Sequence, residues 1–405
     1  MTPDHSLRIQ PTRTNAPSSD TLSPPPPPPT VPSPSPILAA GGPHTGFVYD
    51  GKLGELYGIF LPNLLWTILT LTVFRFWAKT RMRRYLWSRT SLNGDRFEYT
   101  GTGGEMFLGF LIVMPVYVLF FLGLQAVHYG FDINPAALFV VQIVAGFLVF
   151  YLTFVAQYAA QRYRLTRTLW RGIRGGMTGS AWSWGSKGML FAFLSGLTLS
   201  LAWPWTQMQL LSDRINNSYF GDAKAQADLK SGPVYVTYFV AILCVVGGLV
   251  IMTMAFGALF AAIYKWFEFD FSDPIALQQS TEFMIVSTVS VVIGYLCFAL
   301  LVVVAFSFYQ VAVAREVAAK LHLGGLRFAT PVTAGRIMGR YVGNILIIVF
   351  TLGFGLPIAI HRTMLFLAAN IEVVGEIEGS DITHANLPRP KAGEGLLEAF
   401  DPGIL

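Results

Sequence analysis

The chain has 405 residues, of which 53% are hydrophobic and only 13% are Asp, Glu, Lys or Arg, with a formal net charge of +5. So few charges exclude an ordinary soluble globular protein and place the chain in the membrane class. The small basic excess lies between apolar stretches, where membrane topology explains it without nucleic acid. The two cysteines, Cys244 and Cys297, lie inside apolar stretches, which predicts small buried residues rather than a disulfide or a metal pair.

The N-terminal segment differs in kind from the rest of the chain. Residues 1–45 are rich in Pro and Ser, with six consecutive prolines from Pro24 to Pro29. Such a segment cannot bury enough apolar surface to fold, so we predict a disordered, polyproline-like tail. It lacks the apolar core of a signal peptide, and we expect it to be retained.

Long apolar stretches follow the tail. Six of them contain no Asp, Glu, Lys or Arg and reach the roughly 20 residues that a membrane-spanning helix needs: 106–127, 136–159, 188–211, 234–263, 283–313 and 341–360. A seventh stretch, 56–77, carries only Arg75, close to its end.

Three of the stretches share one pattern at constant spacing. It reads Thr70-Leu71 then Phe76-Trp77, Thr198-Leu199 then Pro204-Trp205, and Thr351-Leu352 then Pro357-Ile358. A pattern repeated in this way indicates that one unit was duplicated. We therefore predict membrane repeat 1 over 46–163, repeat 2 over 164–315, a truncated repeat 3 over 316–375 and an acidic C-terminal tail over 376–405.

The loops differ sharply in their basic residues. Loops 78–104, 160–187, 212–233 and 314–340 hold six, six, three and five Lys or Arg, whereas 128–135 holds none and 264–282 only Lys265. Cytoplasmic loops are enriched in Lys and Arg. The distribution therefore favours four full spans, at about 106–127, 136–159, 234–263 and 283–313, with three re-entrant or interfacial segments at 56–77, 188–211 and 341–367.

Proline and glycine account for breaks in two of these three segments, because proline removes a helix hydrogen bond and glycine costs helix stability. The residues concerned are Pro204, Gly353, Gly355 and Pro357. The alternative is seven full spans with an irregular charge distribution.

Short glycine-centred segments follow several of the apolar stretches. Leu92-Asn93-Gly94-Asp95-Arg96-Phe97 is matched by Leu323-Gly324-Gly325-Leu326-Arg327-Phe328. Asn-Gly and Gly-Gly between β-prone residues are hairpin signals. We expect short cytoplasmic β-ribbons that join the membrane helices and pair with one another into a cap. The predicted fold class is an all-α polytopic membrane protein with internal repeats and these ribbons.

Four motifs stand out in the first part of the chain after the tail: Phe47–Gly51, Thr70–Trp77, Lys79–Tyr85 and Ser91–Phe97. Together they resemble the YjgN family of bacterial inner-membrane proteins, and the similarity continues to the C-terminus. The resemblance implies a multi-pass protein of the bacterial inner membrane, and the loop charges predict cytoplasmic N- and C-termini. The family is itself a domain of unknown function, so the resemblance implies no reaction.

The chemistry of the apolar stretches limits the possible functions. The four predicted spans contain no ionisable residue, which weighs against ion-coupled transport. Helices broken by Pro or Gly are a device of transporters, so we predict a facilitative transporter or channel. The alternative is a membrane scaffold or envelope-associated protein that binds lipids or partner proteins through its cytoplasmic face. No catalytic signature or metal-ligand spacing occurs, and we predict no enzyme, no cofactor and no metal.

The candidate binding residues lie on or beside the repeated pattern. They are Trp77, Arg81, Arg84, Trp205 and Arg362. The tryptophans could stack on a ligand or form an interfacial belt. The arginines could bind anionic lipid headgroups or reflect only the basic bias of cytoplasmic loops. We expect the lipid bilayer as a partner, anionic headgroups as candidates, and no nucleic acid.

Overall fold

The computed structural model describes residues 44–130, 134–266 and 280–375. The predicted N-terminal tail, apart from its last two residues, and the predicted acidic tail over 376–405 lie outside the described residues.

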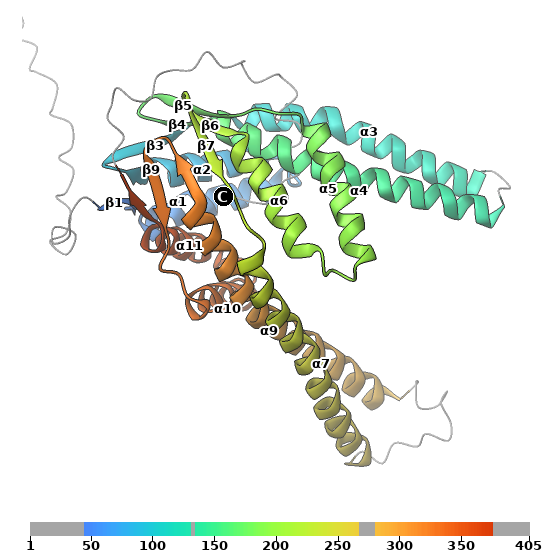
Figure 1. The fold of residues 1–405 in the computed structure, drawn as a ribbon. Coiled ribbons are helices and arrows are strands. Elements are labelled where there is room, and N and C mark those ends of the chain that lie inside the picture. Colours follow the sequence, from blue (N-terminus) through green and yellow to red (C-terminus); the bar gives the residue numbers. More distant parts are fainter. Residues whose placement is uncertain (1–43, 131–133, 267–279, 376–405) are drawn as a thin grey trace, which may run out of the picture. The chain divides into compact units, whose positions relative to one another are not determined.

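Helices pair into hairpins in chain order (Figure 1). Three short hairpins join α1 (Leu53–Leu69) to α2 (Arg75–Ser88), α5 (Ala181–Leu197) to α6 (Trp203–Asn216), and α10 (Ala334–Phe350) to α11 (Leu356–Asn370). Two long hairpins alternate with them and pair α3 (Gly103–Gly130) with α4 (Pro135–Thr166), and α7 (Gly232–Trp266) with α9 (Thr281–Lys320).

Ten short strands connect the hairpins and form one closed antiparallel barrel. The strands are β1 (His44–Tyr49), β2 (Thr90–Leu92), β3 (Asp95–Tyr99), β4 (Thr168–Trp170), β5 (Ile173–Met177), β6 (Ser218–Phe220), β7 (Ala223–Ala227), β8 (Leu321–Leu323), β9 (Leu326–Ala329) and β10 (Glu372–Val374). The first strand pairs with β2 through Phe47 and Leu92, and with β10 through Thr45 and Val373. The two ends of the described chain therefore complete the ring.

Tight turns of two residues join successive strands within each ribbon. Both residues of Asn93-Gly94 have positive φ, 53° and 85°, and so do both residues of Arg171-Gly172, 52° and 73°. Two positive φ angles define the type I′ turn, whose twist matches that of the flanking strands. The ribbon predicted at Leu92–Phe97 is thus present, with Leu92 paired to Asp95.

The architecture shows that the predicted fold class was wrong. The described chain is not all-α, because the ribbons pair all the way round into a barrel. Four full spans are not found either: three helices in the described residues are long and apolar enough to cross a membrane, over Pro135–Thr166, Gly232–Ile263 and Thr281–Lys320. Seven full spans are wrong too, because the three repeated stretches each divide into two shorter helices.

A threonine side chain organises each of these three breaks. Thr198 Oγ1 donates to the Leu194 carbonyl at 2.9 Å and accepts from the Ala202 N–H at 3.1 Å. Thr70 and Thr351 make the same two kinds of bond. These bonds satisfy backbone groups that a helix end would leave unpaired. The first hairpin therefore turns without the proline or glycine that the other two carry.

The barrel has an apolar interior and a polar exterior. Along β3, Arg96 and Glu98 are exposed while the alternate residues Phe97 and Tyr99 are covered. The interior cluster consists of Leu92, Trp170, Leu326 and Val373, packed against Phe47, Phe97, Phe220, Phe328 and Ile371. Because side chains fill this small barrel, it is a packed core and not a pore.

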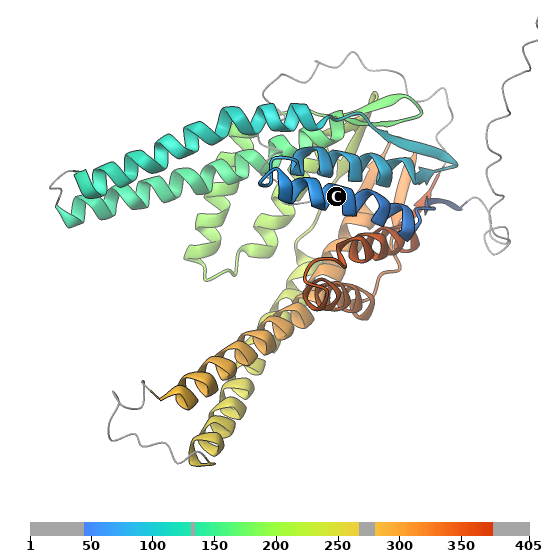
Figure 2. The ribbon, with the colours of Figure 1, turned by 180° about the vertical axis from the view of Figure 1, so that it is seen from behind.

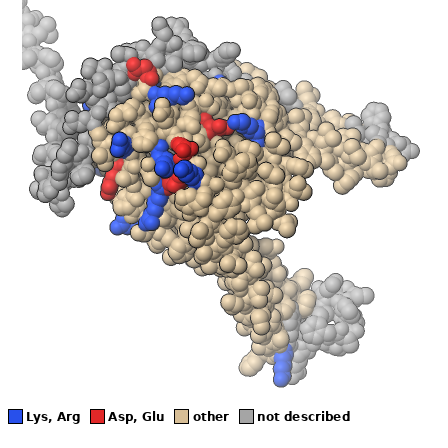
Figure 3. All heavy atoms as spheres, viewed as in Figure 1, with Lys and Arg blue, Asp and Glu red and all other residues tan. Residues whose placement is uncertain are grey.

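The helices away from the barrel expose apolar surface. In the three membrane-length helices, at most 11% of the residues in the most apolar window are buried. Figure 2 shows both long hairpins extending away from the strands. Figure 3 shows charged side chains gathered over the strands and adjacent helix ends, while the long hairpins are almost bare of charge on this face. Lipid is the environment that suits such surface.

Candidate ligand cavity beneath the barrel

A cavity of about 570 Å³ lies where the helices enter the barrel. We call it the sub-barrel cavity. Its walls come from four strands and from the strand-proximal ends of α2, α4, α6 and α11. The lining residues are Phe47, Trp87, Thr90, Phe97, Gln161, Arg164, Leu165, Thr168, Leu211, Arg214, Met364 and Leu367. Ligand pockets have this size and this mainly apolar character.

Local capping fixes the helix ends that form the walls. The Thr168 hydroxyl donates to the Arg164 carbonyl at 2.9 Å, and the Ser218 hydroxyl donates to the Arg214 carbonyl at 2.8 Å. Each bond satisfies a carbonyl in the last helical turn, at the point where the chain leaves the helix for a strand. The backbone of Arg164 and of Arg214 is thereby fixed where each helix meets the cavity wall.

Aromatic rings separate the cavity from the opposite end of the barrel. Phe47 and Phe97 stack with ring centroids 5.8 Å apart, and Phe97 lies 6.3 Å from Trp170. The indole N–H of Trp170 donates to the Leu92 and Asp95 carbonyls at 3.3 and 3.2 Å. A ligand in the sub-barrel cavity would therefore contact the rings of Phe47 and Phe97, which pack on into the barrel core.

Both charged side chains of the cavity are cationic. Arg164 and Arg214 lie in the last turns of α4 and α6, where a positive charge also interacts favourably with the helix dipole. Burial, followed by the charge of Arg164, lowers the pKa of Arg214. The Arg214 guanidinium lies over the Trp184 ring at 5.5 Å, and its Nε is buried without a hydrogen-bond partner.

Two of the predicted binding residues, Trp77 and Arg81, lie on α2 and contact side chains of the neighbouring segments. Trp77 packs against Phe74 and Phe107, with centroid distances of 6.1 and 5.3 Å. Arg81 donates to the Asn63 side chain at 3.4 Å and lies over the Phe74 ring at 5.2 Å. Neither residue lines the sub-barrel cavity.

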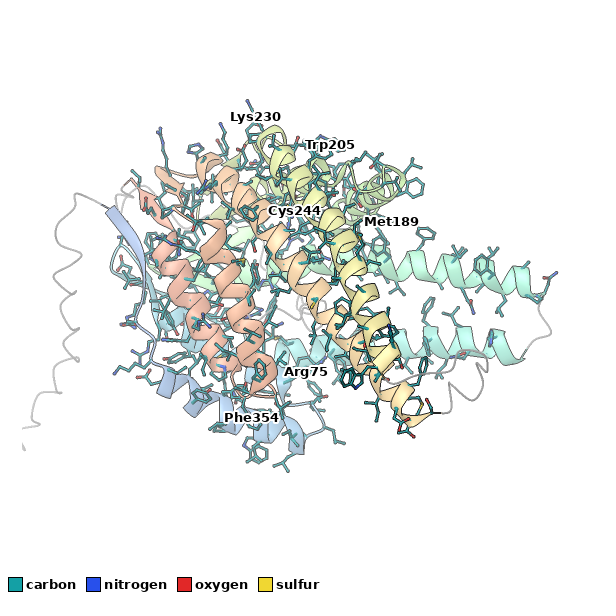
Figure 4. The ribbon with its side chains drawn as sticks, turned by 90° about the horizontal axis from the view of Figure 1, so that it is seen from below. Arg75, Met189, Trp205, Lys230, Cys244 and Phe354 are labelled. Atoms are coloured by element: carbon teal, nitrogen blue, oxygen red, sulfur yellow. The ribbon has the colours of Figure 1, made fainter. Side chains whose placement is uncertain are left out.

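The other three predicted residues are dispersed. Arg84 donates to the Gly101 carbonyl at 2.8 Å, and Arg362 lies against Gly343 of the neighbouring helix. Trp205 contacts Phe191 at 5.1 Å and lies far from the start of α2, as the labelled Trp205 and Arg75 show in Figure 4. The structure therefore does not bring the five residues into one site, and their binding role stays a prediction.

Sequence reasoning missed the residues that line the cavity. Arg164 and Arg214 were counted only as basic loop residues, and Gln161 was not noticed. A usable signal was present, since each arginine stands four residues before a strand that begins with a hydroxyl residue, Thr168 or Ser218. Within the described ranges, no three His, Cys, Asp or Glu side chains gather closely enough to hold a metal ion.

Exposed apolar helices of membrane-spanning length, joined to a barrel with a polar exterior, define a membrane protein. The chain belongs to the family described as "Bacterial protein of unknown function (DUF898)", which it matches over residues 44–399. It is also similar to the inner membrane protein YjgN of Salmonella typhimurium (38% identical over 76 residues) and of Escherichia coli K12 (36% over 75 residues).

These two matches cover 19% and 18% of the chain and 19% of each relative, so the chain spans about a fifth of the length of the curated relatives it matches. No solved structure matches the chain. The names of the relatives and the apolar helices together support a protein of the bacterial inner membrane.

Proposed function

We propose that this protein is a membrane-anchored binding protein that takes an apolar or amphiphilic small molecule into the sub-barrel cavity. The observation that carries the proposal is the cavity itself, about 570 Å³ with aromatic and aliphatic walls and few polar groups. A concave, mainly apolar pocket with convergent polar groups is the usual form of a small-molecule site. The alternative to a transporter predicted from the sequence is a scaffold that binds lipids or partner proteins through its cytoplasmic face. The cavity proposed here keeps lipid-like binding from that alternative but not the scaffold role.

The path into the cavity supports a ligand that comes from the membrane. Side chains fill the barrel interior, so a ligand enters between the helices rather than through the ring of strands. The same helices carry the exposed apolar surface that lipid would cover. A molecule dissolved in the bilayer therefore reaches the cavity along apolar surface.

A facilitative transporter or channel ranks second. In the described residues the long hairpins α3–α4 and α7–α9 do not pack against each other, so a single chain offers no helix bundle around a central path. Solute flux or conductance by the purified protein in liposomes would reverse this ranking.

Photocrosslinking in nanodiscs tests the binding function. The probe is a diazirine derivative of hexadecanol, which is neutral, and crosslinked peptides are mapped by mass spectrometry. We expect crosslinks on the cavity-lining parts of α4, α6 and α11. The substitution Leu211→Trp fills the cavity from its wall and should weaken crosslinking about tenfold or more.

The matched control is Leu346→Trp, which adds the same side chain to an exposed position on α10. It should leave crosslinking unchanged. Labelling that spreads over the membrane helices, or that responds equally to both substitutions, would refute a ligand site in the sub-barrel cavity.

The predicted orientation and domain division complete the proposal. We propose that the barrel and both termini lie in the cytoplasm in a multi-pass arrangement, because the basic loops all lead into strands. The shared threonine turns support the division into repeats over 46–163, 164–315 and 316–375. The substitution Asp222→Cys, made in a chain in which Cys244 and Cys297 are replaced by Ala, tests the orientation. The new thiol should react with an impermeant maleimide only after the inner membrane is opened.

A further inference from the structure

Arg214 is one of the two arginines that line the sub-barrel cavity. Among the described side chains no carboxylate pairs with it, and its Nε is buried with no hydrogen-bond partner. The adjacent Asp213 is held by Lys187, with a distance of 2.7 Å between Nζ and Oδ2. The contact that the guanidinium does make is with the Trp184 ring. A partly buried cation with an unsatisfied donor is costly unless a partner arrives.

A second positive charge lies on the wall of the same cavity. Arg164 lines the same cavity, and its charge acts on Arg214 in the direction of repulsion. Glu105, at the start of α3, is bound by Arg167 at 2.9 Å and by the Tyr163 hydroxyl at 2.7 Å. An Arg214 side chain with no carboxylate partner among the described residues, beside a second positive charge in a largely apolar cavity, points to an anionic group at Arg214.

We propose that the ligand of the sub-barrel cavity is a single-chain anionic amphiphile, with its carboxylate or phosphate group at Arg214, where the nearby positive charge of Arg164 also favours an anion. The inference rests on the proposed binding function and adds the charge of the ligand to it. The apolar chain of the ligand lies against the aromatic wall of Phe47, Phe97 and Trp87. Gln161, which also lines the cavity, supplies an amide near the two arginines.

A purely structural role makes a different forecast. Arginine in the last turn of a helix stabilises the negative end of the helix dipole. If that were the whole role of Arg214, its replacement by Met would lower the thermal unfolding temperature of the ligand-free protein. If Arg214 instead serves to bind an anion, replacing it by Met removes a charge that has no carboxylate partner in the ligand-free protein. The ligand-free variant should then unfold at a temperature equal to or higher than that of the unchanged protein.

The binding experiment compares three unlabelled competitors of the hexadecanol probe in nanodiscs of neutral lipid: palmitate, hexadecanol and inorganic phosphate. We expect palmitate to compete at about 10- to 100-fold lower concentration than hexadecanol, since a hydrogen bond to a charged group contributes about 1.5–3 kcal/mol. The preference should disappear in Arg214→Met and persist in part in Arg214→Lys. Arg174→Met, on the exposed side of β5, is the matched control and should behave as the unchanged protein.

Each outcome decides a separate question. Equal competition by palmitate and hexadecanol would overturn the charge assignment while leaving the binding function intact. Failure of both to compete would instead overturn the binding function. Displacement of the probe by inorganic phosphate as effectively as by palmitate would show that the site takes a free anion, and would overturn the amphiphile. A palmitate preference that survives Arg214→Met would remove Arg214 from the site.

Discussion

Trp170 holds the barrel core together, and its replacement by Ala tests whether the closed ring behaves as one cooperative unit. The side chain is 3% exposed, lies between Phe97 and Phe220 at 6.3 and 5.9 Å, and donates from its indole N–H to two carbonyls. Truncation of a buried Trp to Ala costs about 3–5 kcal/mol. Because each 1.4 kcal/mol is a factor of ten, amide exchange through global opening of the barrel should accelerate roughly 100- to 4,000-fold.

The assay is hydrogen–deuterium exchange of the protein in nanodiscs, read peptide by peptide. We expect faster exchange in all ten strands, including β8, β9 and β10, which lie on the other side of the ring from β4 in strand order. Leu169→Ala, one residue away and on the alternate face of the same strand, is the control and should change exchange little. Faster exchange confined to β3, β4 and β5 would refute a cooperative barrel.

Two further predictions concern single positions in the short hairpins. Gly353→Ala places a side chain at φ of +89° with open space around it, so we expect a loss of about 1 kcal/mol from backbone strain alone, measured by thermal unfolding. The control Gly339→Ala, in the middle of α10 and also with open space, should be neutral or stabilising, and equal effects at both positions would refute the strain argument. Burial lowers the pKa of His361 in the folded protein, and its Nδ1 lies buried without a hydrogen-bond partner. The neutral side chain therefore contributes fully to stability above pH 6.5, the ordinary pKa of histidine in an unfolded chain, and that contribution is lost as the pH falls below 6.5. The unfolding temperature should therefore fall more steeply between pH 7.5 and 5.5 in the unchanged protein than in His361→Gln, and parallel curves would contradict the assignment.

Local signals explain what the sequence could predict. Asn93-Gly94 marks a tight turn because both residues tolerate positive φ, and the turn is present. Apolar length needs no partner to be recognised, and three of the four predicted spans, 136–159, 234–263 and 283–313, lie in helices long and apolar enough to cross a membrane. The common pattern at Thr70, Thr198 and Thr351 singled out three segments that do share one hydrogen-bonding arrangement.

The barrel could not be predicted in the same way, because its pairings are non-local. Most of its strands have three to five residues, too few for a clear alternating pattern, and Thr45 pairs with Val373 across nearly the whole described chain. Charge was equally ambiguous. Arg214 looked like one more basic residue of a cytoplasmic loop, and only the fold places it on a cavity wall beside Arg164.

The pairing of β1 with both β2 and β10 has a consequence for biosynthesis. The ribosome makes β1 first and β10 last among the ten strands, so one edge of β1 stays open while all the helices between them are synthesised and inserted. An unpaired strand edge is a site for wrong pairing with another chain. Until the residues up to Val374 have been synthesised, β10 is not available to pair with this edge of β1, so the edge is open to wrong pairing throughout synthesis of the helices.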